Sequence, residues 1–305
     1  MNLDLEVFGN TFQNPVMLAS GTCGYGVELS EYLDLDTLGG LVIKAVTIEE
    51  CAGNPAPRVT QFAAGMLNSI GLANVGVAAV KREKLPWLAA HLQRAHVFVN
   101  VAGRTVDEFA QIISALDSEA GFLGYELNVS CPNVKEGGTY FSSRVDLLAA
   151  AVKAARAATR KPLVVKLAPN VPDIGAMAEV AADAGADGLT LINTVPGLLF
   201  DIHERRPVLG AGSGGVSGPA ILPVGVHAVF QARRRVAIPI IGVGGIRTAQ
   251  DAAQYLLAGA SLFQIGTASF ADPHAAERVL SGLKRLGQKL GVAHVRELIG
   301  AGVVH

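Results

Sequence analysis

The sequence has few cysteines and no long uninterrupted apolar run. Cys23, Cys51 and Cys131 are its three cysteines among 305 residues. They are too few and too scattered for a disulfide framework, and they predict a reducing, cytoplasmic location. No apolar stretch approaches the length of a membrane span, and Met1–Pro15 has neither the basic nor the apolar region of a signal peptide. We therefore expect neither secretion nor association with a membrane.

An excess of charge of one sign is also missing. Lys and Arg number 25 against 26 Asp and Glu, and charged residues make up only 17% of the chain. Without a basic face or a polybasic run, nucleic acids and anionic membranes are not expected partners. The histidines lack the spacing of metal ligands, so we expect no metal site.

Short apolar runs instead alternate along the chain with segments of helical pattern. Half of the residues are hydrophobic, enough for one large core. Eight runs are rich in Val, Ile and Leu without strict alternation, which is typical of parallel strands buried on both faces. These runs are Val16–Ser20, Leu41–Ala45, Val97–Val101, Tyr125–Val129, Leu163–Leu167, Gly188–Asn193, Pro239–Gly244 and Leu262–Gly266.

Ala-rich amphipathic segments separate many of these runs. Val145–Thr159, Ile174–Ala184 and Thr248–Ala258 are examples. Gly185 and Gly259 follow two of them, as expected at helix C-caps. Eight strand–helix units predict an α/β protein, a single (β/α)8 TIM barrel domain that takes in residues 1–305.

Two segments depart from this alternation. Asn2–Gln13 predicts an N-terminal β-hairpin that turns at Gly9-Asn10 and plugs the bottom of the barrel. About fifty residues separate the second and third strands, a length that predicts an inserted active-site lid.

Polar side chains gather at the carboxyl ends of the runs. They are Ser20, Lys44, Asn100, Asn128, Lys166 and Asn193. In a barrel these ends converge on the face that carries catalytic groups. A lone Asn at a strand end is more often structural, but two lysines are costly to desolvate without an anion. The set predicts a site for a flat, anionic ligand rich in hydrogen-bonding groups.

Glycine-rich loops follow the last two strands, at Gly242–Ile246 and Gly266–Ser269. Glycines there let backbone N–H groups approach a phosphate, although tight packing also favours glycine. Because both loops match, we favour the phosphate site. Gly210–Gly215 also fits the spacing G-x-G-x-x-G, but it follows a charged loop rather than a buried strand. We therefore expect a flexible loop there and no dinucleotide-binding fold.

Cys131 lies just beyond the strand Tyr125–Val129, before Pro132, which cannot continue a ladder. A free cysteine is most often a small buried hydrophobe. Its place at a strand mouth, next to the glycine-containing segment Lys135–Gly138, favours a reactive thiol. The residues alone leave open whether that thiol is a base or a nucleophile.

A series of short motifs runs along the chain: Asn14-Pro15, Ala19–Thr22, Lys44, Gly53–Arg58, Asn68–Leu72, Glu126–Asn133, Lys166–Asn170, Ile192–Thr194, Gly214–Pro219, Gly244–Ile246 and Gly266-Thr267. In this order, the motifs resemble class 1 of the dihydroorotate dehydrogenase family over almost the full chain. The resemblance implies an FMN enzyme that oxidises (S)-dihydroorotate to orotate in de novo pyrimidine biosynthesis. Cys131 would then remove the C5 proton while hydride leaves C6 for the flavin, and Lys166 would stabilise the reduced flavin.

The resemblance also implies two sets of binding residues besides the catalytic Cys131 and Lys166. The substrate set is Lys44, Asn68, Ser69, Ile70, Gly71, Leu72, Asn128, Asn193 and Thr194. The FMN set is Ser20, Lys44, Ala45, Asn100, Asn128, Lys166, Ile192, Gly218, Gly244, Gly245, Gly266 and Thr267. Ala45 departs from the pattern, because many relatives carry Ser or Thr there, and we expect a modest effect of the lost hydrogen bond.

The subclass follows from the same resemblance. A cysteine base and the amino-terminal sequence argue against the membrane-bound class. The amino-acid sequence at residues 19–22 and 193–197 is similar to that of the NAD-linked type 1B. That type implies a homodimer joined by an electron-transfer subunit with FAD and a [2Fe–2S] cluster, which three scattered cysteines could not ligate. The alternatives are the fumarate-linked type 1A, a flavin barrel similar to dihydropyrimidine dehydrogenase, and a non-redox phosphate-binding barrel.

Overall fold

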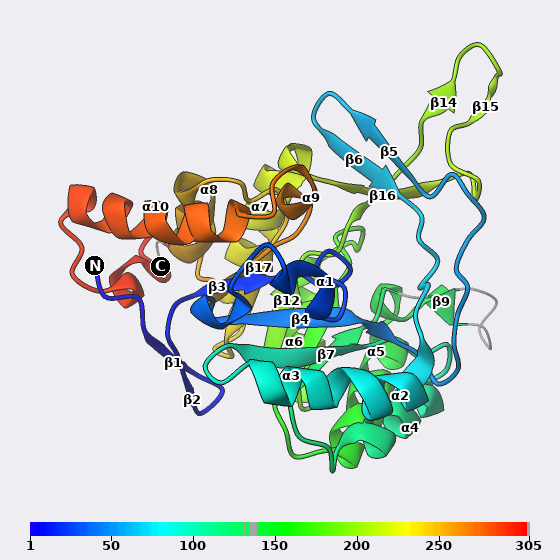
Figure 1. Ribbon diagram of the computed structural model, residues 1–305, viewed down its shortest axis with the longest axis horizontal. Coiled ribbons are helices and arrows are strands. Elements are labelled where there is room, and N and C mark those ends of the chain that lie inside the picture. The colour runs from blue at the N-terminus through cyan, green and yellow to red at the C-terminus, as the bar shows by residue number, and fades with distance from the viewer. Residues whose placement is uncertain (131, 134–138, 304–305) are drawn as a thin grey trace.

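The computed structural model describes residues 1–130, 132–133 and 139–303, and its centre is a closed barrel of eight parallel strands (Figure 1). All eight predicted runs form these strands. In chain order they are β3 (Val16–Leu18), β4 (Gly40–Val46), β7 (His96–Val101), β8 (Gly124–Asn128), β11 (Leu163–Leu167), β12 (Gly188–Leu191), β17 (Ile240–Val243) and β18 (Leu262–Ile265). The barrel closes where β18 pairs with β3, which confirms the predicted (β/α)8 fold.

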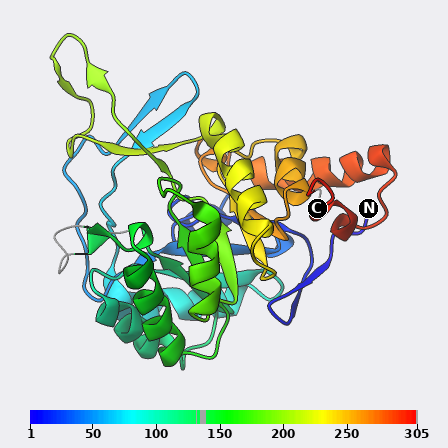
Figure 2. The ribbon, with the colours of Figure 1, turned by 180° about the vertical axis from the view of Figure 1, so that it is seen from behind.

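Helices surround the barrel, and Figure 2 shows α5, α6 and α7 side by side on its outer face. The longer helices are α3 (Leu85–His91), α4 (Val106–Leu116), α5 (Val145–Ala158), α6 (Ile174–Asp183), α7 (Leu222–Arg233), α8 (Ala249–Leu257) and α10 (Ala275–Leu290). The short helices are α1 (Val27–Ser30), α2 (Gly76–Ala79) and α9 (Ala268–Ala271), with single turns at η1 (Leu35–Thr37), η4 (Phe141–Ser143), η5 (Pro219–Ile221) and η6 (Val295–Leu298) and a π-helical turn at η2 (Val80–Lys84).

The predicted helix boundaries have clear chemical causes. Thr248 caps α8 in a capping box with Asp251, which satisfies backbone N–H groups of the first turn. Gly185 and Gly259, just beyond α6 and α8, have φ values of 107° and 110°. Residues with a side chain rarely adopt such a φ, so glycine is favoured at the point where these helices end.

The N-terminal hairpin forms as predicted, from β1 (Leu5–Val7) and β2 (Asn10–Phe12). Its turn consists of Phe8 and Gly9, one residue earlier than predicted, because both have the positive φ that a two-residue hairpin turn requires. The Phe8 ring lies 5.8 Å from that of Phe98 and borders Gly188 at the start of β12. The hairpin therefore covers the amino-terminal end of the barrel.

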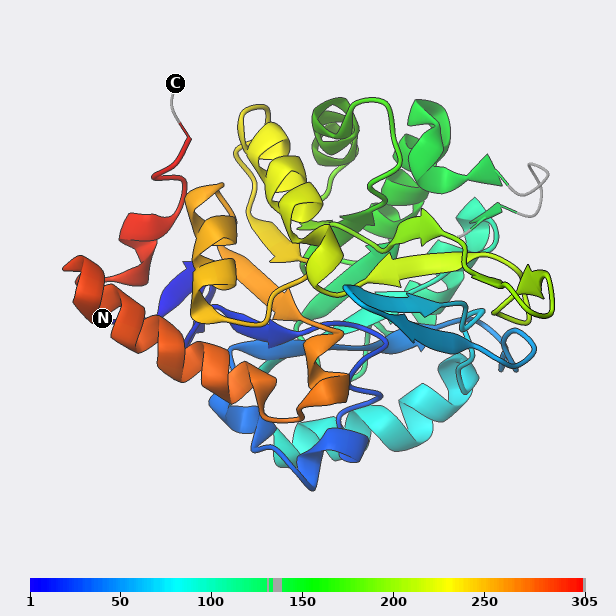
Figure 3. The ribbon, with the colours of Figure 1, turned by 90° about the horizontal axis from the view of Figure 1, so that it is seen from above.

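A second, antiparallel sheet lies beside the opposite end of the barrel, and we call it the roof sheet. Its strands, in spatial order, are β13 (Val195–Gly197), β16 (Gly214–Ser217), β6 (Gly65–Asn68) and β5 (Val59–Phe62). Figure 3 shows β5, β6 and β16 lying next to one another. Part of the predicted insertion thus folds as β5 and β6; its action as a moving lid stays a prediction.

The roof sheet also corrects one detail of the sequence interpretation. The last two residues of the segment 210–215 belong to β16, so that segment is not a loop throughout. They pair with β6 and β13 instead of entering a helix. The remaining short strands are the paired β14 (Phe200–Asp201) and β15 (Arg206–Pro207), and the paired β9 (Pro132–Asn133) and β10 (Thr139–Tyr140).

Among the residues that the structure describes, no helix combines the length and the apolar character needed to cross a membrane.

Candidate active site

A cavity of about 540 Å³ opens at the carboxyl ends of the barrel strands, beside the roof sheet. Its volume lies within the range of small-molecule and cofactor sites. Most of the predicted site residues line it: Ser20, Lys44, Ala45, Asn68, Ile70, Leu72, Asn128, Lys166, Ile192, Asn193, Thr194, Gly218, Gly244, Gly245, Gly266 and Thr267. The fold therefore brings together residues that are up to about 250 positions apart in the chain, as expected where barrel strands end.

Ser69 and Gly71 belong to the predicted substrate set but do not line the cavity. The Asn54 side chain donates a 2.7 Å hydrogen bond to Ser69 Oγ. Gly71 has a φ of 69°, and a Cβ there would lie 2.5 Å from the Asn54 backbone nitrogen. Asn54 thus supports this segment from behind, while Ile70 and Leu72 contribute to the cavity wall.

Asn100 is likewise absent from the cavity wall. It is fully buried on β7, and its Nδ2 donates a 2.8 Å hydrogen bond to Glu126 Oε1. Its Oδ1 is buried without a hydrogen-bond partner in the described part of the chain. Asn100 is therefore an unsatisfied acceptor behind the wall, and its predicted contact with a cofactor stays a prediction.

Sequence reasoning gave no role to Glu126, which the structure places next to the site. It lies inside the barrel on β8, and its carboxylate accepts hydrogen bonds from Asn100, Thr190 and Gln264. The sequence did contain a clue to its position: Glu126 precedes Asn128 by two residues in the predicted strand Tyr125–Val129, and side chains two apart on a strand share a face. The hydrogen-bond partners of Glu126 could not be predicted, because they come from strands distant in the sequence.

The two cavity lysines have different electrostatic surroundings. Lys166 Nζ lies 3.5 Å from Glu126 Oε1. Lys44 has no ion pair among the described residues. The positive charge of Lys44 is therefore the one that an anionic ligand in the cavity would best compensate.

Amide side chains also line the cavity, and one of them, Asn128, lies beside Lys166 on the neighbouring strand. Asn193 Nδ2 donates to Asn128 Oδ1 at 3.3 Å, and Asn193 Oδ1 accepts from the Thr194 backbone N–H at 2.8 Å. On the roof sheet, Asn68 Nδ2 donates to the Gly215 carbonyl at 3.1 Å. These bonds fix the direction of each amide, and the amides offer both donors and acceptors to a ligand.

The two predicted phosphate loops line the same cavity. Gly244 and Gly245 have φ values of 128° and 75°, which exclude larger residues. Near them, Thr267 Oγ1 donates a 2.7 Å hydrogen bond to Ser217 Oγ. At Gly242, in contrast, close packing explains the glycine, because a Cβ there would lie 2.3 Å from the Tyr255 ring. Sequence reasoning also missed Ser217 and Arg247 as lining residues.

Cys131, the predicted base, lies outside the described residues. Cys23 is buried, and its Sγ donates to the Val42 carbonyl at 3.2 Å. Burial, and then the charge of Glu28, raise the pKa of the Cys23 thiol to about 12, which keeps it protonated and unreactive. Cys51 does not line the cavity and donates to the Gly71 carbonyl. No group of three or more metal-ligating side chains occurs within the described ranges.

Comparison with known proteins identifies relatives over nearly the whole chain. The family model described as dihydroorotate dehydrogenase matches residues 2–286. The chain is 46% identical over 300 residues to "Dihydroorotate dehydrogenase B (NAD(+)), catalytic subunit" of Geotalea uraniireducens, covering 98% of each chain. The same name belongs to a protein of Geobacter sulfurreducens, also 46% identical over 98% of each chain. A protein of Solibacter usitatus, provisionally named dihydroorotate dehydrogenase A (fumarate), is 48% identical and covers 98% of this chain and 97% of its own.

Proposed function

This chain belongs to the dihydroorotate dehydrogenase family, and we propose that it oxidises (S)-dihydroorotate to orotate in de novo pyrimidine biosynthesis. The observation that carries the proposal is the cavity at the barrel mouth. It joins two lysines, a cluster of amides and two glycine-rich loops within one enclosure. That combination suits a flat, anionic substrate beside a phosphate-bearing cofactor.

Membership in this family implies a flavin, and we propose that the flavin is FMN. The residues present fit such a group, because the loops at Gly244-Gly245 and Gly266-Thr267 line the cavity, and glycine in such loops lets backbone N–H groups approach a phosphate. Lys166 would place its charge beside the ring system, where it favours the anionic reduced form. Bound FMN would supply the chemistry that the chain lacks, the acceptance of hydride from C6 of the substrate.

The substrate would lie against the amides and Lys44. Lys44 has no ion pair within the described ranges, and its positive charge favours a carboxylate as partner. Asn68, Asn128 and Asn193 offer donors and acceptors at fixed orientations to a pyrimidine ring. The segment 68–72, supported by Asn54, would close over the ring and hold it in one orientation.

Cys131 would act as the base that takes the C5 proton. The other two cysteines support this assignment, because Cys23 is buried with a raised pKa and Cys51 lies away from the cavity wall. An ordinary thiol pKa near 8.5 suits proton abstraction at mildly alkaline pH. We also propose a cytoplasmic location, which the unpaired thiols of Cys23 and Cys51 support.

We further propose that electrons leave through a separate subunit to NAD⁺. Relatives named as catalytic subunits of the NAD-linked enzyme support a partner, which would carry FAD and a [2Fe–2S] cluster and join a homodimer of this chain. Transfer to fumarate is the second candidate, favoured by the 48% identical relative.

The proposed activity is tested by colour and turnover. The purified protein should be yellow or should take up added FMN, and dihydroorotate should reduce the bound flavin faster than dihydrouracil does. A colourless protein that does not bind FMN would exclude the flavin account. Reaction with dihydrouracil alone would point instead to an enzyme similar to dihydropyrimidine dehydrogenase.

The electron acceptor is tested by co-expression. The chain should reduce NAD⁺ only when it is co-purified with a subunit carrying FAD and iron–sulfur. Rapid reduction of fumarate by the chain alone would overturn the NAD-linked assignment in favour of the fumarate-linked one.

A further inference from the structure

Glu126 is a buried carboxylate to which the proposed chemistry gives no role. Its side chain is 1% exposed. Oε1 accepts from Asn100 Nδ2 at 2.8 Å, and Oε2 accepts from Thr190 Oγ1 at 2.8 Å and Gln264 Nε2 at 2.9 Å. In the strand order of the barrel, β18 with Gln264 lies opposite β8 with Glu126. The carboxylate therefore bonds across the interior of the barrel, not only to neighbouring strands.

Within the described residues, the charged partner of Glu126 is Lys166. The Lys166 side chain is 8% exposed, and its Nζ is 3.5 Å from Glu126 Oε1. Two buried charges of opposite sign are tolerated only while they remain together. Movement of the Lys166 ammonium away from the cavity wall would leave the Glu126 carboxylate uncompensated. Glu126 therefore restricts where the Lys166 charge can lie.

Glu126 also fixes the direction of the Asn100 amide. A carboxylate accepts hydrogen bonds, so the NH₂ group of Asn100 must face it. The Asn100 oxygen then faces away from Glu126, buried and without a partner in the described part of the chain. One carboxylate oxygen, Oε1, thus places the Lys166 charge and presents Asn100 as an acceptor.

We infer that Glu126 is a positioning residue of the flavin site, acting mainly through Lys166 rather than by contact with the ligand. Glu126 does not line the cavity, whereas Lys166 does. The identity of the ligand rests on the proposed function. The coupling between Glu126 and Lys166 is a property of the chain without any ligand, and it can be measured separately.

The first test compares two substitutions around the same carboxylate. Glu126→Gln keeps the shape but removes the charge next to Lys166. Thr190→Val removes a bond to Oε2 and leaves the Oε1 contacts intact. Flavin fluorescence during titration of the apoprotein with FMN gives the dissociation constant. We expect Glu126→Gln to raise it by about tenfold or more, as for residues that orient metal ligands, and Thr190→Val by less than about twofold.

The second test repeats Glu126→Gln in a Lys166→Met background. If Glu126 acts largely through Lys166, its substitution should weaken FMN binding by no more than about threefold there. An equal loss in both backgrounds, or no loss in the chain with Lys166 intact, would overturn the inference. Activity of the loaded enzyme is not needed for either comparison.

The third test uses denaturant unfolding of the apoprotein. Removing both charges should disturb the fold less than removing either alone, so the double variant should unfold at higher denaturant concentration than each single variant. If Glu126→Gln alone fails to fold and the double variant folds, the coupling is supported. If neither variant folds, the fold depends on the hydrogen bonds of Glu126 to its other partners, and the inference is overturned. Failure of the unsubstituted chain to bind FMN would refute the proposed function but leave this coupling measurable.

Discussion

At the scale of single residues, the reactive groups of the site differ in how completely the fold surrounds them. Lys166 is paired with a buried carboxylate, while Lys44 has no ion pair among the described residues. Cys23 is enclosed and carries a raised pKa, so it cannot serve as a base near neutral pH. Local surroundings, and not residue type, therefore separate the groups available to a ligand from those that only support the barrel.

Substitution of Cys131 tests the proposed base. Cys131→Ala should leave FMN binding unchanged and slow flavin reduction by dihydroorotate by about 10³-fold, within the range for loss of a general base. Cys131→Ser should keep slight activity that rises with pH, since a hydroxyl loses its proton less readily than a thiol. Stopped-flow absorbance of the flavin measures both rates. An unchanged rate in Cys131→Ala would remove this residue from the mechanism.

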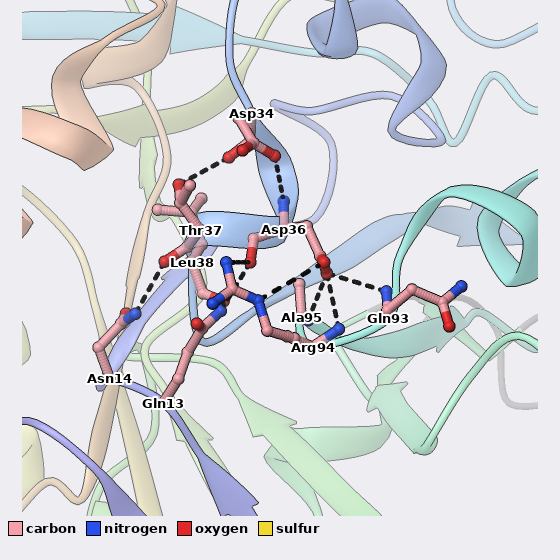
Figure 4. A network of polar contacts seen from close by, with 9 residues as sticks. All are labelled: Gln13, Asn14, Asp34, Asp36, Thr37, Leu38, Gln93, Arg94 and Ala95. Atoms are coloured by element: carbon pink, nitrogen blue, oxygen red, sulfur yellow. Dashed lines mark hydrogen bonds and ion pairs between the residues drawn. The ribbon is translucent and has the colours of Figure 1, made fainter.

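At the scale of elements, one carboxylate joins two turns at the amino-terminal side of the barrel (Figure 4). Asp36 lies in η1, before β4, and accepts hydrogen bonds from the backbone N–H groups of Gln93, Arg94 and Ala95. These three residues form the approach to β7. Asp36 therefore ties the starts of two neighbouring barrel strands together.

The protonation of Asp36 should appear in the stability of the protein. Partial burial would raise the pKa of this carboxyl, but the N–H groups of Ala95, Arg94 and Gln93 and the Arg94 charge together lower it. A lowered folded-state pKa stabilises the fold above the usual carboxyl pKa, and this contribution is lost as the pH falls through the folded value.

Asp36→Asn should accordingly reduce the free energy of unfolding by about 2 kcal/mol at pH 7. The difference between variant and parent should shrink below about pH 4. Urea unfolding at pH 7 and at pH 3.5, about half a unit below the usual carboxyl range, measures it. The exposed Asp183 supplies the control, as Asp183→Asn. A difference that is independent of pH would contradict the assigned role of the carboxylate.

Thr194 packs against Gly215 of the roof sheet, where there is no side chain to displace it. A Cβ at Gly215 would lie 2.0 Å from Thr194 Oγ1, so Gly215→Ala must displace Thr194 or separate β16 from β13. We expect the KM for dihydroorotate to rise by about tenfold with smaller changes in FMN affinity. Steady-state kinetics and FMN titration measure these quantities. Val216→Ala, on the same strand, is the control; equal effects of both would mean that the sheet as a whole, and not Thr194, determines KM.

The barrel strands could be predicted because each is an apolar run long enough to be recognised alone. The roof sheet could not be predicted, since β6 and β16 lie about 150 residues apart and neither is continuously apolar. The turn at Phe8-Gly9 was misplaced by one residue because Asn10 is as typical of turns as glycine. Ser69 and Gly71 were predicted from a motif, which does not say which residues of a segment face the cavity.

At the scale of the whole molecule, the two ends of the barrel have separate tasks. The hairpin of β1 and β2 closes the amino-terminal end, where Phe8 packs on Phe98 and borders Gly188. The cavity lies at the other end, beside the roof sheet. This division is usual for barrels, in which one face serves stability and the other chemistry.

Phe8→Ala tests that division. Loss of the ring should lower the free energy of unfolding by about 2 kcal/mol, less than for a fully buried phenylalanine because Phe8 is partly exposed. The kcat and KM for dihydroorotate should not change. Denaturant unfolding and steady-state kinetics give the two readouts. A change in KM comparable to that of Gly215→Ala would show that the two ends are coupled.

The roof sheet has a consequence for anyone who exchanges loops between barrels of this family. Two of its strands, β5 and β6, come from the excursion after β4, and the other two, β13 and β16, come from the excursion after β12. Their shared edge is the pairing of β6 with β16. A graft of either excursion alone would leave a strand edge with unmatched register. The two excursions are thus a single transplantable unit, although more than a hundred residues of barrel separate them.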